Sequence, residues 1–217
     1  MPQVDIQAPN LLVEEWVQGN PSNIDRERCK VILIEFFPVN CPGCFILGFP
    51  EVLEIHQKFQ DRPLVIWGLA TAFDNFDKNN LQNLKNLLST GEVIGDTLAM
   101  LSERGLLNFN RLKYGIPFPV AWDKIVECEE NLNARVQKII ARDFPNFNDL
   151  PEPKKELILK QVKSYSREKK YDAISFETYG LMGTPSSLLI DKKGVLRYKL
   201  FGAGQELDQK IEFLLGE

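Results

Sequence analysis

Two continuous apolar runs, separated by a helix-length segment, most constrain how this chain can fold. Residues 31–37 (VILIEFF) and 64–70 (LVIWGLA) are rich in branched and aromatic side chains and almost free of polar ones. Such runs are typical of strands buried on both faces of a sheet. The segment between them is expected to form a helix from near Pro42 to about Phe59, and strands joined by a helix lie parallel. The sequence therefore predicts an α/β fold around a βαβ unit.

The other elements are predicted from hydrophobic period and from Gly and Pro punctuation. Residues 75–112 are expected to be rich in helix, with a break near 89–91, and residues 117–123 (PFPVAWD) to form a strand. Asp123 is expected to cap a helix over about 124–142, whose apolar stripe would hold Ile125, Cys128, Leu132, Val136 and Ile139. Three further elements are expected: a helix over 151–171, a hairpin from the segments SSLLI and VLRYKLF around the turn DKKG, and a final helix over about 205–215.

Composition narrows the class of protein. The 217 residues, 44% of them hydrophobic, suit a single domain with a sizeable core. A net charge of −4 argues against a nucleic-acid-binding surface. The apolar run at 31–37 is too short to span a membrane and carries Glu35, so no membrane association is predicted. The N-terminal segment lacks the features of a signal peptide, which predicts a cytoplasmic location.

The most informative motif is the pair Cys41 and Cys44, separated by Pro42-Gly43 directly after the first predicted strand. Proline is favoured at the first position of a helix, because its missing N–H would have no partner there. Cys41 is therefore expected at the N-cap, where unpaired amides and the helix dipole stabilise a thiolate. A second thiol one turn later can resolve a mixed disulfide. The motif predicts a dithiol couple in which Cys41 attacks and Cys44 resolves.

Two other interpretations of the pair stay open at this point. A structural zinc site wants four ligands, and besides the pair the chain offers only His56, Cys29 and Cys128. His56 is expected about three turns further along the helix, and Cys128 on an apolar stripe. The pair could also be two inert buried thiols, although this leaves the position at a helix start unexplained. No metal ligand set and no cofactor are predicted.

Glu35 is the second informative residue, because it lies inside an apolar strand, six positions before Cys41. A buried carboxylate costs several kcal/mol unless it is paired or neutralised. The structural interpretation is an edge position or a hydrogen bond. The functional interpretation, favoured beside a C-x-x-C motif, is an acid of raised pKa that takes and returns the proton of Cys44.

With these residues in place, the chain resembles the thioredoxin-like superfamily, in its redoxin and thiol-disulfide oxidoreductase branch. VILIEFFPVNCPGC is similar to that family's strand, buried acid and active-site turn. GTPSSLLIDKKGVLRYKLFG is similar to its proline loop, hairpin and glycine. APNLLVEEW and YGIPFPVAWD resemble the N-terminal segment and extra strand of the redoxin branch. The resemblance covers roughly 5–73, 114–123 and 178–217.

The resemblance implies a thioredoxin-like fold, a central mixed sheet flanked by helices. It implies that Pro185 is a cis-proline facing the dithiol, and that Thr184 pairs with an extended substrate, with Pro42 and Gly43 also at the substrate-binding surface. The helical stretch at about 124–175 has no counterpart in the family, so we expect an insertion before the proline loop. This insertion either packs against the domain or offers a surface to a partner or substrate.

Two departures from the family leave the direction of the chemistry open. Asn40 stands where thioredoxins have a tryptophan, and Pro42-Gly43 reverses their Gly-Pro order. Such residues alter thiolate stability and hence reduction potential.

The leading hypothesis is a thiol-disulfide oxidoreductase that reduces disulfides of proteins or small molecules and takes electrons from an unidentified donor. A thiol peroxidase of the peroxiredoxin type is the alternative, although Pro38 stands where that family has a threonine. A binding module that responds to redox state without turnover is a third.

Overall fold

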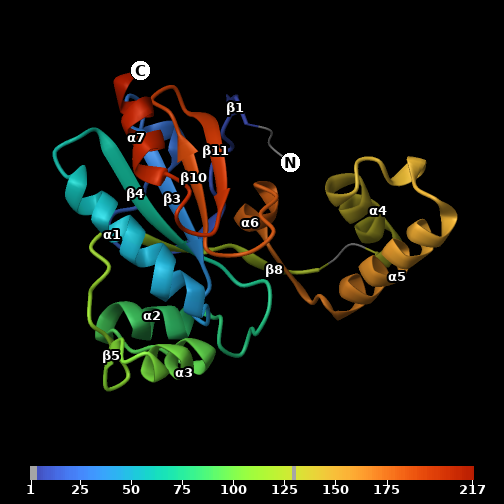
Figure 1. Cartoon of the computed structure of the whole chain (residues 1–217), viewed down its shortest axis with the longest axis horizontal. Helices are drawn as coiled ribbons and strands as arrows, with labels where there is room; N and C mark the ends of the chain where they lie inside the picture. The colour runs from blue at the N-terminus through green and yellow to red at the C-terminus, as the bar shows by residue number, and fades with distance from the viewer. Residues whose placement is uncertain (1–3, 129–130) are drawn as a thin grey trace.

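A mixed seven-stranded sheet forms the centre of the protein in the computed structural model, which describes residues 4–128 and 131–217 (Figure 1). The strand order is β1 (Ile6–Gln7), β11 (Val195–Phe201), β10 (Ser186–Ile190), β3 (Val31–Phe37), β4 (Leu64–Ala70), β7 (Val120–Asp123) and β2 (Val13–Gln18). The pairs β3–β4 and β4–β7 are parallel, and the other pairs are antiparallel. The predicted α/β class and mixed sheet are therefore confirmed.

The two apolar runs form the middle of this sheet, as predicted. β3 and β4 pair in parallel from Val31↔Leu64 to Phe37↔Ala70, and every residue of β3 is buried. Because side chains alternate along a strand, Leu33 and Phe37 enter one core cluster while Ile32, Ile34 and Phe36 enter another on the opposite face. Glu35 shares the face of Leu33 and Phe37.

Helices cover both faces of the sheet. Apolar residues of four helices join the core cluster that holds Leu33 and Phe37: α1 (Phe49–Lys58), α2 (Leu81–Thr90), α3 (Gly95–Glu103) and α7 (Leu207–Gly216). On the other face lie α6 (Ile174–Thr178) and the 3₁₀ turn Ile24–Arg26. The predicted break between α2 and α3 is confirmed at Gly91, which ends α2 with φ of 76°.

The elements near the C-terminus also agree with the sequence. α5 (Glu152–Glu168) lies within the predicted helix at 151–171. β10 and β11 form the predicted hairpin, and α7 ends the chain. β7 is shorter than predicted because Pro117 and Pro119 have no N–H for the ladder. A small hairpin of β5 (Leu107–Asn108) and β6 (Arg111–Leu112) was not predicted.

The helix predicted over 124–142 is wrong in its first part. Ile125–Glu127 form a strand, β8, which pairs with β9 (Tyr171–Ala173), and Cys128 follows that strand rather than lying on a helical stripe. The helix α4 spans Leu132–Asp143. It begins only at Leu132 because the side chain of Asn131 caps its N-terminus by accepting from the amide of Ala134. Tertiary pairing with β9 decides the conformation of 125–127, and part of the predicted helix, 129–130, lies outside the described residues.

Asp123 caps a different helix from the one predicted. It is fully buried, and its carboxylate accepts hydrogen bonds from the amides of Ser175 and Phe176, in the first turn of α6, and from Thr71 Oγ1. Burial raises the pKa of Asp123 above its ordinary value, although these hydrogen bonds oppose the shift.

α4 and α5 form a helix pair that projects from the sheet on the β8–β9 ribbon (Figure 1). A 3₁₀ turn, Phe147–Asp149, connects the two helices. Arg135 of α4 is buried and donates to the carbonyls of Ser166 and Lys169, so the pair is held together by its own contacts.

Candidate redox site

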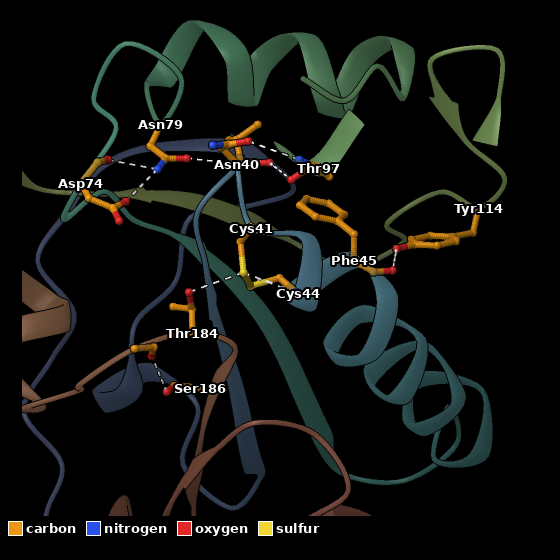
Figure 2. The surroundings of a disulfide bond; sticks show 12 residues. Asn40, Cys41, Cys44, Phe45, Asp74, Asn79, Thr97, Tyr114, Thr184 and Ser186 are labelled. Atoms are coloured by element: carbon orange, nitrogen blue, oxygen red, sulfur yellow. Dashed lines mark hydrogen bonds between the residues drawn. A yellow bond between two sulfur atoms is a disulfide. The ribbon is translucent and has the colours of Figure 1, made fainter. Parts of the chain in front are cut away.

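A disulfide joins Cys41 and Cys44 where β3 passes into the helix that follows it (Figure 2). The helix begins at Pro42, directly after Cys41, as the sequence predicted. Cys44 is fully buried, whereas Cys41 is half-buried. The amide of Cys44 lies 3.0 Å from the carbonyl oxygen of Cys41 and 3.3 Å from its Sγ. A helix-start amide therefore donates to the more exposed sulfur, an arrangement that favours a thiolate there.

The helix is wound as a π-helix over Cys44–Gly48 before it continues as α1. The amide of Phe49 donates to the carbonyl of Cys44, five residues back. Pro50 has no N–H, so it cannot give the carbonyl of Phe45 the same kind of bond. Tyr114 Oη donates to that carbonyl instead, at 2.8 Å (Figure 2). The π segment thus leaves a carbonyl, one residue after Cys44, for a side chain from another part of the chain.

Glu35 is buried in β3, with 1% of its surface exposed, so the edge interpretation does not hold. Its Oε2 accepts a hydrogen bond from Ser187 Oγ of β10 at 2.5 Å. Burial raises the pKa of Glu35 to about 8, against the opposing effect of the Ser187 bond. A carboxyl with such a pKa can take and release a proton near neutral pH.

Gly48 lies between this carboxyl and the proline loop. A Cβ at position 48 would lie 2.7 Å from Glu35 Oε1 and 3.0 Å from Pro185 Cβ. Only a residue without a side chain lets the three elements approach so closely. Gly48 lies four residues after Cys44, so Glu35 faces the same stretch of helix that carries the buried cysteine.

The proline loop approaches the dithiol from the other side. The Thr184–Pro185 peptide bond is cis, and Thr184 Oγ1 lies 3.6 Å from Cys41 Sγ (Figure 2). A Cβ on Gly43 would lie 3.8 Å from Pro185 Cδ, an ordinary contact distance. The structure therefore brings Cys41, Gly43 and the loop together, with Pro42 half-buried at the helix start.

In the sequence, Asn40 stood out only as a departure from the family. In the structure it makes several hydrogen bonds. Its backbone N–H donates to Asn79 Oδ1 at 2.7 Å, and its Nδ2 donates to Asp96 Oδ2 at 2.9 Å. Its Oδ1 accepts from the amides of Asp96, at 2.7 Å, and Thr97, at 3.3 Å. Asn40 therefore supplies the N-terminal cap of α3 from another part of the chain (Figure 2).

One signal in the sequence points to this contact. α3 begins after Ile94, which offers no side-chain cap of its own, so the first amides of the helix need a partner elsewhere. Sequence alone does not show which distant residue supplies it.

The residues considered for a metal site are dispersed. Cys29 and Cys128 are free, and the ring of His56 lies 6.1 Å from that of Phe118. Among residues 4–128 and 131–217, no group of three or more His, Cys, Asp or Glu side chains could hold a metal. The same residues include no helix long and apolar enough to cross a membrane.

A groove of about 330 Å³ lies between the helix pair and the body of the protein. Phe144 and Val162 line it from the helix pair, and Phe73, Phe176 and Met182 from the body. Met182 is 81% exposed and lies two residues before Thr184. The groove therefore reaches the start of the proline loop.

Comparison with known proteins agrees with this fold. The chain is similar to a thioredoxin-like superfamily protein of known crystal structure, with 26% identity and a TM-score of 0.60 over 98% of this chain and 97% of that one. It is also similar to a thiol-disulfide isomerase from Corynebacterium glutamicum, with 24% identity and a TM-score of 0.58 over 98% and 97% of the two chains. A solution structure of an oxidised thioredoxin-like protein shares the fold at 15% identity and a TM-score of 0.53, over 98% of this chain and 96% of that one. At the level of sequence, no family profile and no curated protein matches the chain.

The fold and the disulfide at the start of its helix define a protein of the thioredoxin-like class. The fold and the likeness to a thioredoxin-like superfamily protein place the chain in the thioredoxin-like superfamily. The Cys41–Cys44 pair, together with this likeness, supports a redox function.

Proposed function

We propose that the protein is a thiol-disulfide oxidoreductase that reduces disulfides through the Cys41–Cys44 couple. The observation that carries this proposal is the disulfide at a helix start, with one sulfur half-exposed and the other buried. A nucleophile must reach its substrate, whereas a resolving thiol needs only to reach the nucleophile.

The reaction has two exchange steps. In the first, the Cys41 thiolate attacks one sulfur of the substrate disulfide, forms a mixed disulfide and releases the other substrate sulfur as a thiolate. In the second, Cys44 loses its proton and attacks Cys41 Sγ, which releases the second substrate sulfur and forms the 41–44 disulfide. Two electrons pass from the protein to the substrate, and a dithiol donor restores the reduced form by the reverse steps.

Glu35 has the role of proton acceptor in the second step. Its carboxyl is buried, has a pKa of about 8 and faces the helix that carries Cys44. It takes the proton of Cys44 as that thiol attacks and returns it to the departing substrate thiolate. Exchange in the opposite direction uses the same group in reverse.

The proline loop and the turn between the cysteines have the role of substrate surface. Thr184 Oγ1 lies beside Cys41 Sγ, and Pro185 contacts the position of Gly43, so a substrate disulfide at Cys41 meets this loop together with Pro42. In this proposal, backbone groups of Thr184 pair with an extended polypeptide substrate.

We further propose that the helix pair is an insertion in a single thioredoxin-like domain. The chain leaves and returns at adjacent points, since the amide of Cys128 donates to the carbonyl of Lys170 at 2.9 Å. In this proposal the insertion lies between β8 and β9, within the stretch of about 124–175 expected from the sequence. The groove beside Met182 supports a role of the helix pair in contacting substrate.

We also propose that the protein works in the cytoplasm.

A turnover assay tests the proposed function. The purified protein, supplied with a dithiol reductant, is expected to reduce a disulfide-bonded polypeptide far faster than the reductant alone. Cys41→Ser removes the nucleophile and is expected to abolish the gain. If the serine variant retained the wild-type rate, exchange through Cys41 would be ruled out.

A further inference from the structure

Two hydrogen-bonded anchors flank the dithiol, and both come from the segment between β4 and β7. Asn40, directly before Cys41, is bonded to Asn79 and to the first turn of α3. The carbonyl of Phe45, directly after Cys44, accepts a hydrogen bond from Tyr114 Oη. The four-residue motif is therefore held at both ends by one neighbouring unit (Figure 2).

The anchor at Asn40 is closely fitted. Gly95, at the start of α3, has φ of +57°, a conformation that favours glycine. A Cβ at this position would lie 2.4 Å from Asn40 Oδ1. Thr97 Oγ1 adds a bond to the carbonyl of Val39 at 3.2 Å. The backbone before Cys41 is thus fixed by the amide of Asn40, by the carbonyl of Val39 and by the buried side chain of Asn40.

The consequence for the chemistry differs between the two redox states. In the oxidised protein, the bond to Cys44 itself holds Cys41 beside the Cys44 amide and Thr184 Oγ1. Reduction removes this covalent restraint. What then holds Cys41 beside those donors is the backbone on either side of it, and the Asn40 anchor fixes that backbone.

We propose that Asn40 is a positioning residue that keeps the Cys41 thiolate within reach of its hydrogen-bond donors in the reduced protein. This inference rests on the proposed function. It explains how Asn40, which replaces the tryptophan of thioredoxins, affects the stability of the Cys41 thiolate. Because the anchor contributes more to the reduced form than to the oxidised form, its loss destabilises the thiolate selectively. The thiol of Cys41 then ionises at higher pH, and the couple becomes less oxidising.

Asn40→Ala tests this inference, with Asn80→Ala as the matched control. Asn80 caps α2 through the amide of Asn83 at 2.9 Å, so the control removes the same kind of helix cap in the same unit without a bond to residues 39–45. The rate at which iodoacetamide alkylates Cys41 in the reduced protein is measured against pH. In Asn40→Ala the midpoint is expected to rise by about one unit, equal to about tenfold less thiolate below the midpoint. The reduction potential is expected to fall by about 30 mV if that tenfold change appears in full.

The outcomes separate the positioning role from simple loss of stability. Both variants are expected to unfold at lower denaturant concentration, but only Asn40→Ala is expected to move the alkylation midpoint and the potential. An Asn40→Ala profile that superimposes on that of the wild type, or a shift of equal size in Asn80→Ala, overturns the inference.

A second variant keeps the test open if Asn40→Ala does not fold. Tyr114→Phe removes only the hydroxyl that bonds Phe45, and it is expected to shift the midpoint in the same direction. An unshifted Tyr114→Phe would then overturn the inference. If the wild-type protein forms no reversible 41–44 disulfide, the proposed function itself is overturned. If the wild-type couple is normal and neither variant changes it, only the inference about Asn40 is overturned.

Discussion

Glu35 and Ser187 meet inside the sheet, where Ser187 Oγ of β10 donates to Glu35 Oε2 of β3 at 2.5 Å. The two residues are paired across neighbouring antiparallel strands and are both buried. The serine lies two positions after Pro185, so one short segment carries both the loop that faces Cys41 and the partner of the buried acid. The acid is thereby fixed behind the helix that begins at Pro42, which we call the redox helix.

Glu35→Gln is expected to slow resolution of the mixed disulfide by about 10²-fold near neutral pH, because the amide cannot accept the Cys44 proton. The wild-type rate of this step is expected to rise as pH passes about 8, the pKa of Glu35, and to level off above it. Single-turnover kinetics against pH measure both effects. Ser187→Ala is the companion variant: it removes a bond that lowers the pKa of Glu35, so the rise should move to higher pH. A profile unchanged in Glu35→Gln removes Glu35 from the mechanism.

The same carboxyl makes stability depend on pH in a predictable direction. Its pKa is about 8 in the folded protein against an ordinary value of 4.5, so between these values the folded state holds a proton that the unfolded chain releases. This contribution to stability is present below pH 4.5 and is lost as pH rises to about 8, at up to about 1.4 kcal/mol per pH unit. Denaturant titrations are expected to show this fall in the wild type and a smaller one in Glu35→Gln. If the free energy of unfolding fell equally steeply with pH in both proteins, Glu35 would not be a buried carboxyl with a raised pKa.

Cys44→Ser is expected to accumulate mixed disulfides between Cys41 and substrate, because the resolving thiol is absent. Mass spectrometry of the protein after incubation with a disulfide-bonded polypeptide detects the adduct. The double variant Cys41→Ser, Cys44→Ser is the control and should carry none. Adducts found on Cys29 or Cys128 in place of Cys41 would assign the nucleophile to another thiol.

Gly48→Ala is expected to cost about 1–3 kcal/mol of stability, because its Cβ would overlap Glu35 Oε1 and crowd Pro185. It should also slow substrate reduction, since the acid and the proline loop must move apart. Gly115→Ala is the matched control, as a Cβ there meets nothing within 4 Å. Chemical denaturation and the turnover assay check both effects. A Gly48→Ala protein as stable and active as the control would show that this contact is not needed.

Deletion of the helix pair tests whether it is an insertion. Residues 129–169 are replaced by Asn-Gly, which joins β8 to β9 through a hairpin turn where the Cys128 amide already bonds the Lys170 carbonyl. The shortened protein is expected to unfold cooperatively and to keep the 41–44 couple, with slower reduction of polypeptide disulfides and unchanged reduction of a small disulfide. Loss of the folded state would instead make the helix pair part of the domain core.

The sequence predicted the parts of the fold that local pattern decides. The apolar runs at 31–37 and 64–70 are buried central strands, as their short length and their branched and aromatic side chains predicted. Pro42 after Cys41 placed the start of the redox helix correctly. Glu35 stood out because an acid inside such a run needs a special environment.

Features decided by distant contacts were not predicted. Ile125–Glu127 fit a helical stripe as well as a strand, and only pairing with Tyr171–Ala173 decides between them. Pro50 lies inside a predicted helix, and its missing N–H was a sign of irregular winding, but the partner Tyr114 lies far along the chain. The anchor from Asn40 to α3 joins residues 56 positions apart, a distance over which no periodicity helps.

A redox titration of the Cys41–Cys44 pair in a thiol buffer, followed by alkylation and mass analysis, tests the proposed function most directly. We expect one reversible two-electron transition between these cysteines, at a potential near that of thioredoxin, about −270 mV. A value near that of the oxidant DsbA, about −120 mV, would contradict the reductase direction. Absence of a 41–44 disulfide throughout the titration would contradict the redox function itself.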